Sequence, residues 1–99
     1  MFKAETALNQ LTQSSNGSGR LKVMIGAKNF VKSDEEQWVS FKYPRGKYVK
    51  IKLNSMDLYD VEFGTIRKFE YKVKNTYENT YAEDLKEIFE QETKLYLSL

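Results

Sequence analysis

Two pairs of charged residues are the side chains of this sequence best suited to catalysis or ligand binding. Residues 47–63 read KYVKIKLNSMDLYDVEF, with Lys50 and Lys52 before a polar loop and Asp60 and Glu62 after it. Carboxylates two residues apart on a strand share one face, and such a pair could serve in acid–base catalysis or bind a metal. A hard cation requires several oxygen ligands, and the sequence offers no evident third one. The neighbouring lysines would also compete for the carboxylates, so the pattern favours neither catalysis nor a metal site.

The amino-acid composition excludes most other kinds of catalytic site. The chain of 99 residues contains no cysteine and no histidine. Disulfides, Cys/His zinc sites, cysteine nucleophiles and every triad that needs an imidazole are therefore ruled out. Gly17 and Gly19 lie in a polar stretch, TQSSNGSG, that matches neither of the common glycine-rich phosphate-binding motifs. We expect a protein that is not an enzyme and needs no cofactor.

Length and hydrophobicity indicate one folded domain over residues 1–99. Hydrophobic residues make up 40% of the chain and aromatic residues 14%, which is typical of a globular domain and not of a disordered one. No apolar run reaches the roughly 18 residues of a membrane helix. The first ten residues, MFKAETALNQ, lack the apolar centre of a secretion signal. We therefore expect no membrane association and a cytoplasmic location.

The spacing of apolar residues predicts an α+β fold. In residues 4–11, AETALNQL, apolar side chains recur at helical spacing, and the polar stretch TQSSNGSG then ends the helix. Thr80 and Glu83 match a capping box, which predicts that a C-terminal helix begins there. Segments between these helices alternate with a period of two, as half-buried antiparallel strands do: they cover residues 20–26, 38–43, 48–53, 58–63 and 68–74. We expect an N-terminal helix, a four- to five-stranded antiparallel meander and a C-terminal helix packed on one sheet face.

The alternation also predicts which strand residues face the core. The inward set comprises Leu21, Val23, Ile25, Val39, Phe41, Tyr43, Val49, Ile51, Leu53, Tyr59, Val61, Phe63, Phe69, Tyr71 and Val73. Pairing must place residues of the same face opposite each other. With residues 54–58 as the connecting loop, Lys52 faces Asp60 and Lys50 faces Glu62 on the outer face. Opposite charges in such a register stabilise a sheet by roughly 0.2–1 kcal/mol per pair, which gives these four side chains a sufficient structural role.

Two aromatic residues on the outer face mark the first candidate binding surface. Trp38 and Tyr48 are expected to point away from the core, beside Lys50 and Lys52. Aromatic residues dominate the energetics of protein interfaces. These four residues are therefore candidates for contact with a protein partner, or for the seam of a homodimer. The alternative is that the N-terminal helix or the loop at residues 34–37 covers the two rings.

The basic residues provide a second candidate surface, for nucleic acid. A basic sheet face with aromatic rings can bind phosphates and stack bases. The candidate residues are Lys22, Lys42, Arg45, Lys47, Lys50, Lys52, Lys72 and Lys74, and the six lysines other than Lys47 are predicted to lie on the outer face. The aromatic–glycine signature of RNA-recognition motifs is missing, and Asp60 and Glu62 would weaken the positive field. Nucleic-acid binding is therefore the alternative to a protein partner.

Three segments resemble a group of small proteins encoded by bacteriophages and other bacterial mobile elements. They are GAKNF at residues 26–30, IKLNSMDLYDVEF at residues 51–63 and TKLYLSL at residues 93–99, and the resemblance covers about residues 21–99. The group has no assigned activity, so no functional residue is transferred. Lys94 stands where the group has a glycine, which would suit a helix C-cap. The resemblance implies an accessory protein that binds a bacterial host protein, for host takeover or counter-defence, in the cytoplasm of the host cell.

Overall fold

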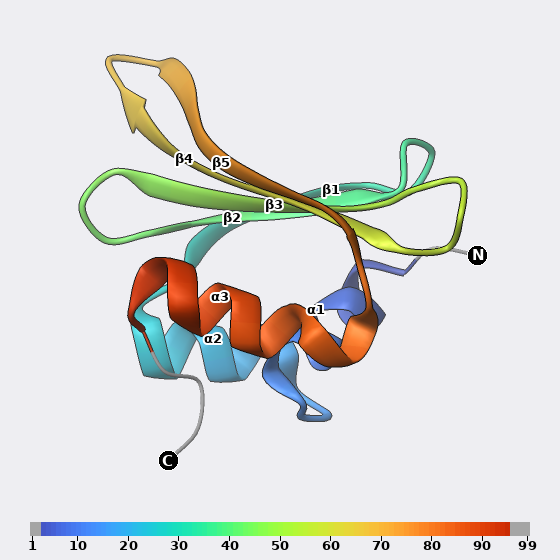
Figure 1. The fold of residues 1–99 in the computed structure, drawn as a ribbon. Helices are drawn as coiled ribbons and strands as arrows, with labels where there is room; N and C mark the ends of the chain where they lie inside the picture. Colours follow the sequence, from blue (N-terminus) through green and yellow to red (C-terminus); the bar gives the residue numbers. More distant parts are fainter. Residues whose placement is uncertain (1–2, 96–99) are drawn as a thin grey trace.

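Alternating side chains build a five-stranded antiparallel sheet, with helical segments before and after it in the sequence (Figure 1). The computed structural model describes residues 3–95. Within these residues the helices are α1 (Ala4–Thr12), α2 (Gly17–Ile25) and α3 (Leu85–Thr93), with a 3₁₀ turn at Ala82–Asp84. The strands are β1 (Lys28–Ser33), β2 (Trp38–Tyr43), β3 (Lys47–Leu53), β4 (Tyr59–Arg67) and β5 (Glu70–Thr80), in that order across the sheet. The chain thus has the predicted α+β fold with a meander sheet.

The helices form a second layer on one face of the sheet (Figure 1). The core between the layers combines apolar residues of all three helices with inward-facing residues of β2, β3 and β4. Phe89 of α3 is fully buried at its centre. Three aromatic rings surround it, with centroids at 6.2 Å for Phe41, 6.1 Å for Tyr43 and 6.2 Å for Phe63. In the described part of the chain no helix lies on the other face of the sheet, which we call the open face.

The strand register around residues 47–63 agrees with the prediction. Lys52 faces Asp60, Lys50 faces Glu62, and Ile51 faces Val61 between them. Ile51 and Val61 are both buried. Because alternate residues point to opposite faces, the four charged side chains belong to the open face.

The prediction of a strand at residues 20–26 is wrong, because most of this segment lies in α2. Leu21 and Ile25 are buried, whereas Val23 is 85% exposed. Leu21 and Ile25 satisfy both a period of two and the i, i+4 spacing of a helix, so the apolar pattern alone could not separate the two structures. Packing of α2 against α1 selects the helix. Gly26, with φ of 70°, then ends it in a left-handed C-cap.

The C-terminal helix begins later than predicted. β5 continues to Thr80, whose hydroxyl donates a hydrogen bond to the carbonyl of Tyr77 at 3.3 Å and caps no helix. A 3₁₀ turn follows, and α3 begins at Leu85. The capping-box pattern at Thr80 and Glu83 therefore does not mark a helix start in this chain. The last four residues of TKLYLSL, 96–99, lie outside the described residues.

A β-bulge reverses the expected facing of the first half of β5. Phe63 pairs with Asn75 and Gly64 pairs with Val73, so Lys74 is an extra residue on β5. An extra residue shifts the alternation by one, so the side chains before it change face. Tyr71 (61% exposed) and Val73 (55% exposed), both predicted to face the core, therefore lie on the open face. Phe69, also predicted to face the core, lies in the turn between β4 and β5 and is 99% exposed.

Lys94 ends α3 in the conformation that a glycine would adopt. Its φ is 60°, and its backbone N–H donates to the carbonyl of Glu90 at 2.9 Å. A left-handed conformation costs a non-glycine residue roughly 1–2 kcal/mol. Because glycine also gains entropy in the unfolded chain, Lys94→Gly is expected to raise the free energy of unfolding by about 0.5–1 kcal/mol. Urea unfolding of Lys94→Gly beside Lys94→Ala measures this. A glycine variant no more stable than the alanine variant would contradict it.

Candidate functional site

The open face combines apolar, aromatic and charged side chains from all five strands. Strand pairing places Val31, Trp38, Ser40, Lys42, Tyr48, Lys50, Lys52, Asp60, Glu62, Tyr71 and Val73 on this face. Val31, Tyr71 and Val73 are each more than half exposed. The exposed apolar groups therefore lie toward the two edges of the face, and the charged residues lie between them.

The ring of Trp38 is less accessible to a protein partner than its predicted position suggested. It lies on the open face, as expected, but it is only partly exposed. The ammonium group of Lys50 lies over its ring, 4.7 Å from the ring centroid, a favourable cation–π arrangement. Its indole Nε1 is buried and has no hydrogen-bond acceptor among residues 3–95. A partner that contacts Trp38 must therefore meet Lys50 first.

Tyr48 lies on the open face but is buried, which corrects the expectation of a solvated ring. Only 4% of the residue is exposed. The ring of Tyr71 covers it edge-on at 5.1 Å, and neither the N-terminal helix nor the loop at residues 34–37 does so. The hydroxyl donates to Glu62 Oε2 at 2.7 Å. Gly64 leaves room for the ring, because a Cβ at this position would lie 2.6 Å from Tyr48 Cε1.

The four charged residues of the opening motif stand in the predicted register, and three of them have other partners. Neither lysine forms an ion pair with these carboxylates in the described part of the chain. Asp60 Oδ1 accepts hydrogen bonds from Asn54 Nδ2 and from the backbone N–H of Asn79, both at 3.0 Å. Glu62 accepts from Tyr48, and Lys50 covers Trp38. The carboxylates are thus structural acceptors. Residues 3–95 hold no group of three or more acidic side chains placed to bind a metal.

Burial raises the pKa of Tyr48, and the hydrogen bond to Glu62 and the charge of that carboxylate raise it further. Since the folded-state pKa exceeds the unfolded value of about 10, the fold favours the protonated phenol. This contribution to stability is complete below about pH 10 and disappears as the pH rises through the folded-state pKa. Tyr48→Phe should therefore lower the free energy of unfolding by about 1–2 kcal/mol at pH 7, and this difference from the wild type should shrink above pH 10. Urea unfolding across this pH range measures the difference. A cost that is independent of pH would contradict it, and Tyr81→Phe, at an exposed position, should match the wild type at pH 7.

The candidate nucleic-acid residues do not form one surface. Lys22 lies on α2, on the helical side of the molecule, with its ammonium group 5.5 Å from the ring centroid of Phe30. Lys72 pairs with Thr65, on the same face as Lys47, and this is the face of the buried Val49. Lys74 is the bulge residue and lines a hollow with Glu92 of α3. The prediction that Lys22, Lys72 and Lys74 lie on the outer face is therefore wrong, whereas Lys42, Lys50 and Lys52 do lie there.

Four of the candidates gather instead at one end of the sheet. The hairpin end of β4 and β5, residues 64–73, projects beyond the helical layer (Figure 1), and we call it the arm. The turn between β2 and β3 joins its base, because the backbone N–H of Ile66 donates to the carbonyl of Gly46 at 2.7 Å. We define the basic end by the cationic residues of the arm, of this turn and of the adjoining strands: Arg45, Lys47, Arg67, Lys68, Lys72 and Lys74. Sequence analysis did not single out Arg67 and Lys68, because their proximity to Lys47 depends on the strand order.

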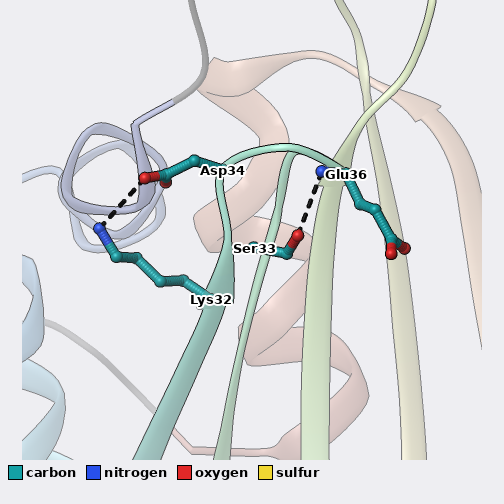
Figure 2. Close-up of polar contacts among 4 residues, drawn as sticks. All are labelled: Lys32, Ser33, Asp34 and Glu36. Atoms are coloured by element: carbon teal, nitrogen blue, oxygen red, sulfur yellow. Dashed lines mark hydrogen bonds and ion pairs between the residues drawn. The ribbon is translucent and has the colours of Figure 1, made fainter.

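The turn between β1 and β2 is exposed at residues 34–36 (Figure 2). Lys32 Nζ lies 3.5 Å from Asp34 Oδ2, and the backbone N–H of Glu36 donates to Ser33 Oγ at 3.1 Å. The two ion-pair side chains are 61% and 62% exposed, so the pair is worth at most about 1 kcal/mol. A hollow of about 520 Å³ lies beside this turn, between α1, α2 and β1. Its rim carries charges of both signs, so it favours neither an anion nor a cation.

Comparisons with known proteins give this chain no relative. No protein-family model matches the sequence, no curated protein matches it, and no solved structure matches the fold. Among residues 3–95, no helix is both long enough and apolar enough to cross a membrane. The open face and the basic end are therefore the two surfaces from which a function is inferred.

Proposed function

We propose that this is a non-enzymatic accessory protein of a bacteriophage or mobile element, which binds a bacterial protein in the cytoplasm of the host. The observation that carries the proposal is the uncovered sheet face with exposed Val31, Tyr71 and Val73. Large apolar side chains that are exposed at both edges of an uncovered sheet face are groups that a protein partner would bury. The resemblance of residues 21–99 to phage and mobile-element proteins supports the origin and the location.

The mixed charge of the open face favours a protein partner there. Lys50, Lys52, Asp60 and Glu62 line one shallow hollow of about 260 Å³, together with Glu78. Carboxylates interleaved with lysines repel phosphates as strongly as the lysines attract them. A protein surface can match both signs, and its apolar residues can cover the valines and the tyrosine. Partner recognition through this face therefore agrees with its chemistry better than nucleic-acid binding does.

The sheet edges are poor alternatives to the open face. β5 is an edge strand, but it carries irregularities between Phe63 and Gly64 and between Tyr59 and Val61 of its neighbour. β1, the other edge, is irregular between Lys28 and Val31. Bulges and lysines on edge strands discourage the addition of a further strand. The partner is therefore expected to contact side chains of the face and not the backbone of an edge.

Matched substitutions of exposed valines test the proposal. Val31→Glu and Val73→Glu place a charge on the open face, whereas Val23→Glu does so on α2, where the residue is 85% exposed. Tagged wild type and the three variants are passed through nuclease-treated bacterial lysate, and retained proteins are identified by mass spectrometry. We expect one bacterial protein on the wild type and on Val23→Glu that both open-face variants lose. A retained protein that is lost only with Val23→Glu, or equal retention by all four, would sink the proposal.

A second copy of the chain is the alternative partner. The same four proteins, run on size-exclusion chromatography, separate the two cases. A wild-type dimer that Val31→Glu and Val73→Glu dissociate would assign the open face to self-association. A monomer in all four leaves the bacterial protein as the occupant.

A further inference from the structure

The basic end concentrates positive charge that the protein itself does not neutralise. Lys47, Thr65 and Lys72 stand in line across β3, β4 and β5, so the two lysines flank one strand on the same face. Lys74 lines a hollow of about 310 Å³ together with Lys47. None of the six cationic side chains of the basic end forms an ion pair or a hydrogen bond with residues 3–95. Clustered cations without counter-charges repel one another, which an anionic ligand would relieve.

Two acids adjoin the basic end and offset only part of its positive charge. Glu70 faces Arg67 across the arm. Glu92 lines the hollow, but both of its carboxylate oxygens are occupied, by Asn75 Nδ2 and by the hydroxyl of Tyr77, at 2.6 Å each. With six cations against two carboxylates, the end is net positive. The open face, in contrast, alternates both signs.

Phe69 at the tip of the arm has no role in the fold. It is 99% exposed, and it adopts a left-handed backbone with φ of 68°, directly after Lys68 with φ of 47°. Two left-handed residues in a hairpin turn favour Asn-Gly, and a phenylalanine there costs stability. A large apolar residue that is strained, exposed and without contacts is the kind of local conflict that marks a functional position.

We propose that the basic end binds single-stranded nucleic acid, with phosphates on Lys47, Lys72 and Lys74 and a base stacked on Phe69. Lys47 and Lys72 lie on the other face of the sheet from Tyr71 and Val73, so this site does not depend on the protein contact proposed for the open face. Lysines bind phosphates as point charges, whereas they are depleted at protein interfaces. An exposed ring stacks on any unpaired base, but it has no access to bases stacked inside a duplex.

Anisotropy titrations of labelled oligothymidylate and oligouridylate test the site. With phosphates on three lysines, the logarithm of the affinity should fall with a slope of about −2 against the logarithm of salt concentration. Lys72→Glu should weaken binding by about tenfold and flatten this slope. The matched control is Lys52→Glu, an exposed lysine on the open face, which should stay within about twofold of the wild type. Comparison of the two oligonucleotides assigns the site to DNA, RNA or both.

Phe69→Gly tests the stacking of a base on Phe69 without destabilising the fold. It removes the ring and relieves the left-handed strain, so the variant should melt no lower than the wild type while it binds about tenfold more weakly with an unchanged salt slope. Four results would overturn the site: no saturable binding, equal losses with Lys52→Glu and Lys72→Glu, equal affinity for duplex of the same length, or full affinity in Phe69→Gly. Polyglutamate that competes as well as oligothymidylate would also overturn it, and would assign the end to an acidic protein.

Discussion

Phe89→Ala is expected to remove about 3–5 kcal/mol from the free energy of unfolding. Phe89 is fully buried between α3 and the sheet, where its ring packs on Phe41, Tyr43 and Phe63. Alanine would leave a cavity between two layers that are each held rigid by their own backbone hydrogen bonds, so the cavity cannot collapse. The free energy of unfolding of small domains is only about 5–15 kcal/mol in total, so the variant should be close to unfolding at 37 °C.

Urea unfolding of Phe89→Ala beside Phe69→Ala measures this effect. The two variants make the same chemical change, but Phe69 is 99% exposed, so its removal should change stability by less than about 0.5 kcal/mol. Similar losses in the two variants would mean that α3 does not pack on the sheet as described. A small loss in both would carry the same meaning.

Gly64→Ala is the second substitution with a large expected effect: it should lower the free energy of unfolding by about 2–3 kcal/mol. A single added Cβ would lie 2.6 Å from Tyr48 Cε1 and would also collide with the backbone carbonyl of Lys72. The ring cannot move far, because Tyr71 lies against it at 5.1 Å and its hydroxyl is bonded to Glu62. Either Tyr48 leaves its position or β4 and β5 separate at the base of the arm.

The pKa of Tyr48 reports which response occurs. In the wild type, burial and Glu62 raise this pKa above its usual value. If the ring is displaced, absorbance of tyrosinate should appear at lower pH in Gly64→Ala. The control is Gly26→Ala, where the added Cβ meets only Pro44 at 3.6 Å and the cost is limited to the left-handed φ of 70°, about 1 kcal/mol. A Gly64→Ala protein no less stable than Gly26→Ala would contradict the close approach of the ring.

The central hairpins could be predicted from the sequence because side-chain period and charge agree there. Residues 47–53 and 59–63 alternate on either side of the loop, and one register alone places both lysines opposite acids. The partners of those charges could not be predicted. Lys50 prefers the ring of Trp38, and Glu62 takes the hydroxyl of Tyr48. Both contacts are diagonal or depend on burial, which a register does not specify.

The two largest errors have physical causes outside the local sequence. The apolar residues of 20–26 fit the spacing of a strand and of a helix equally well. Packing against α1 stabilises the helix. Gly17 lies so close to α1 that a Cβ there would meet the backbone of Leu8. The bulge at Lys74 follows from pairing with β4, which has no signature in β5 itself. That one extra residue moved Tyr71 and Val73 onto the open face and removed Lys72 and Lys74 from it. It therefore changed the candidate site more than any other feature of the fold.

The emission of Trp38 provides the most direct test of the claim that the chain has two separate binding surfaces. It is the only tryptophan of the chain, it lies on the open face under Lys50, and it stands at the end of β2 opposite to the basic end. Five residue steps along β2 lead from it to Tyr43, a distance of about 17 Å. We predict that the bacterial partner changes this emission when it displaces Lys50, whereas saturating oligothymidylate leaves it unchanged. A change of emission with oligothymidylate, or none with the partner, would contradict the account.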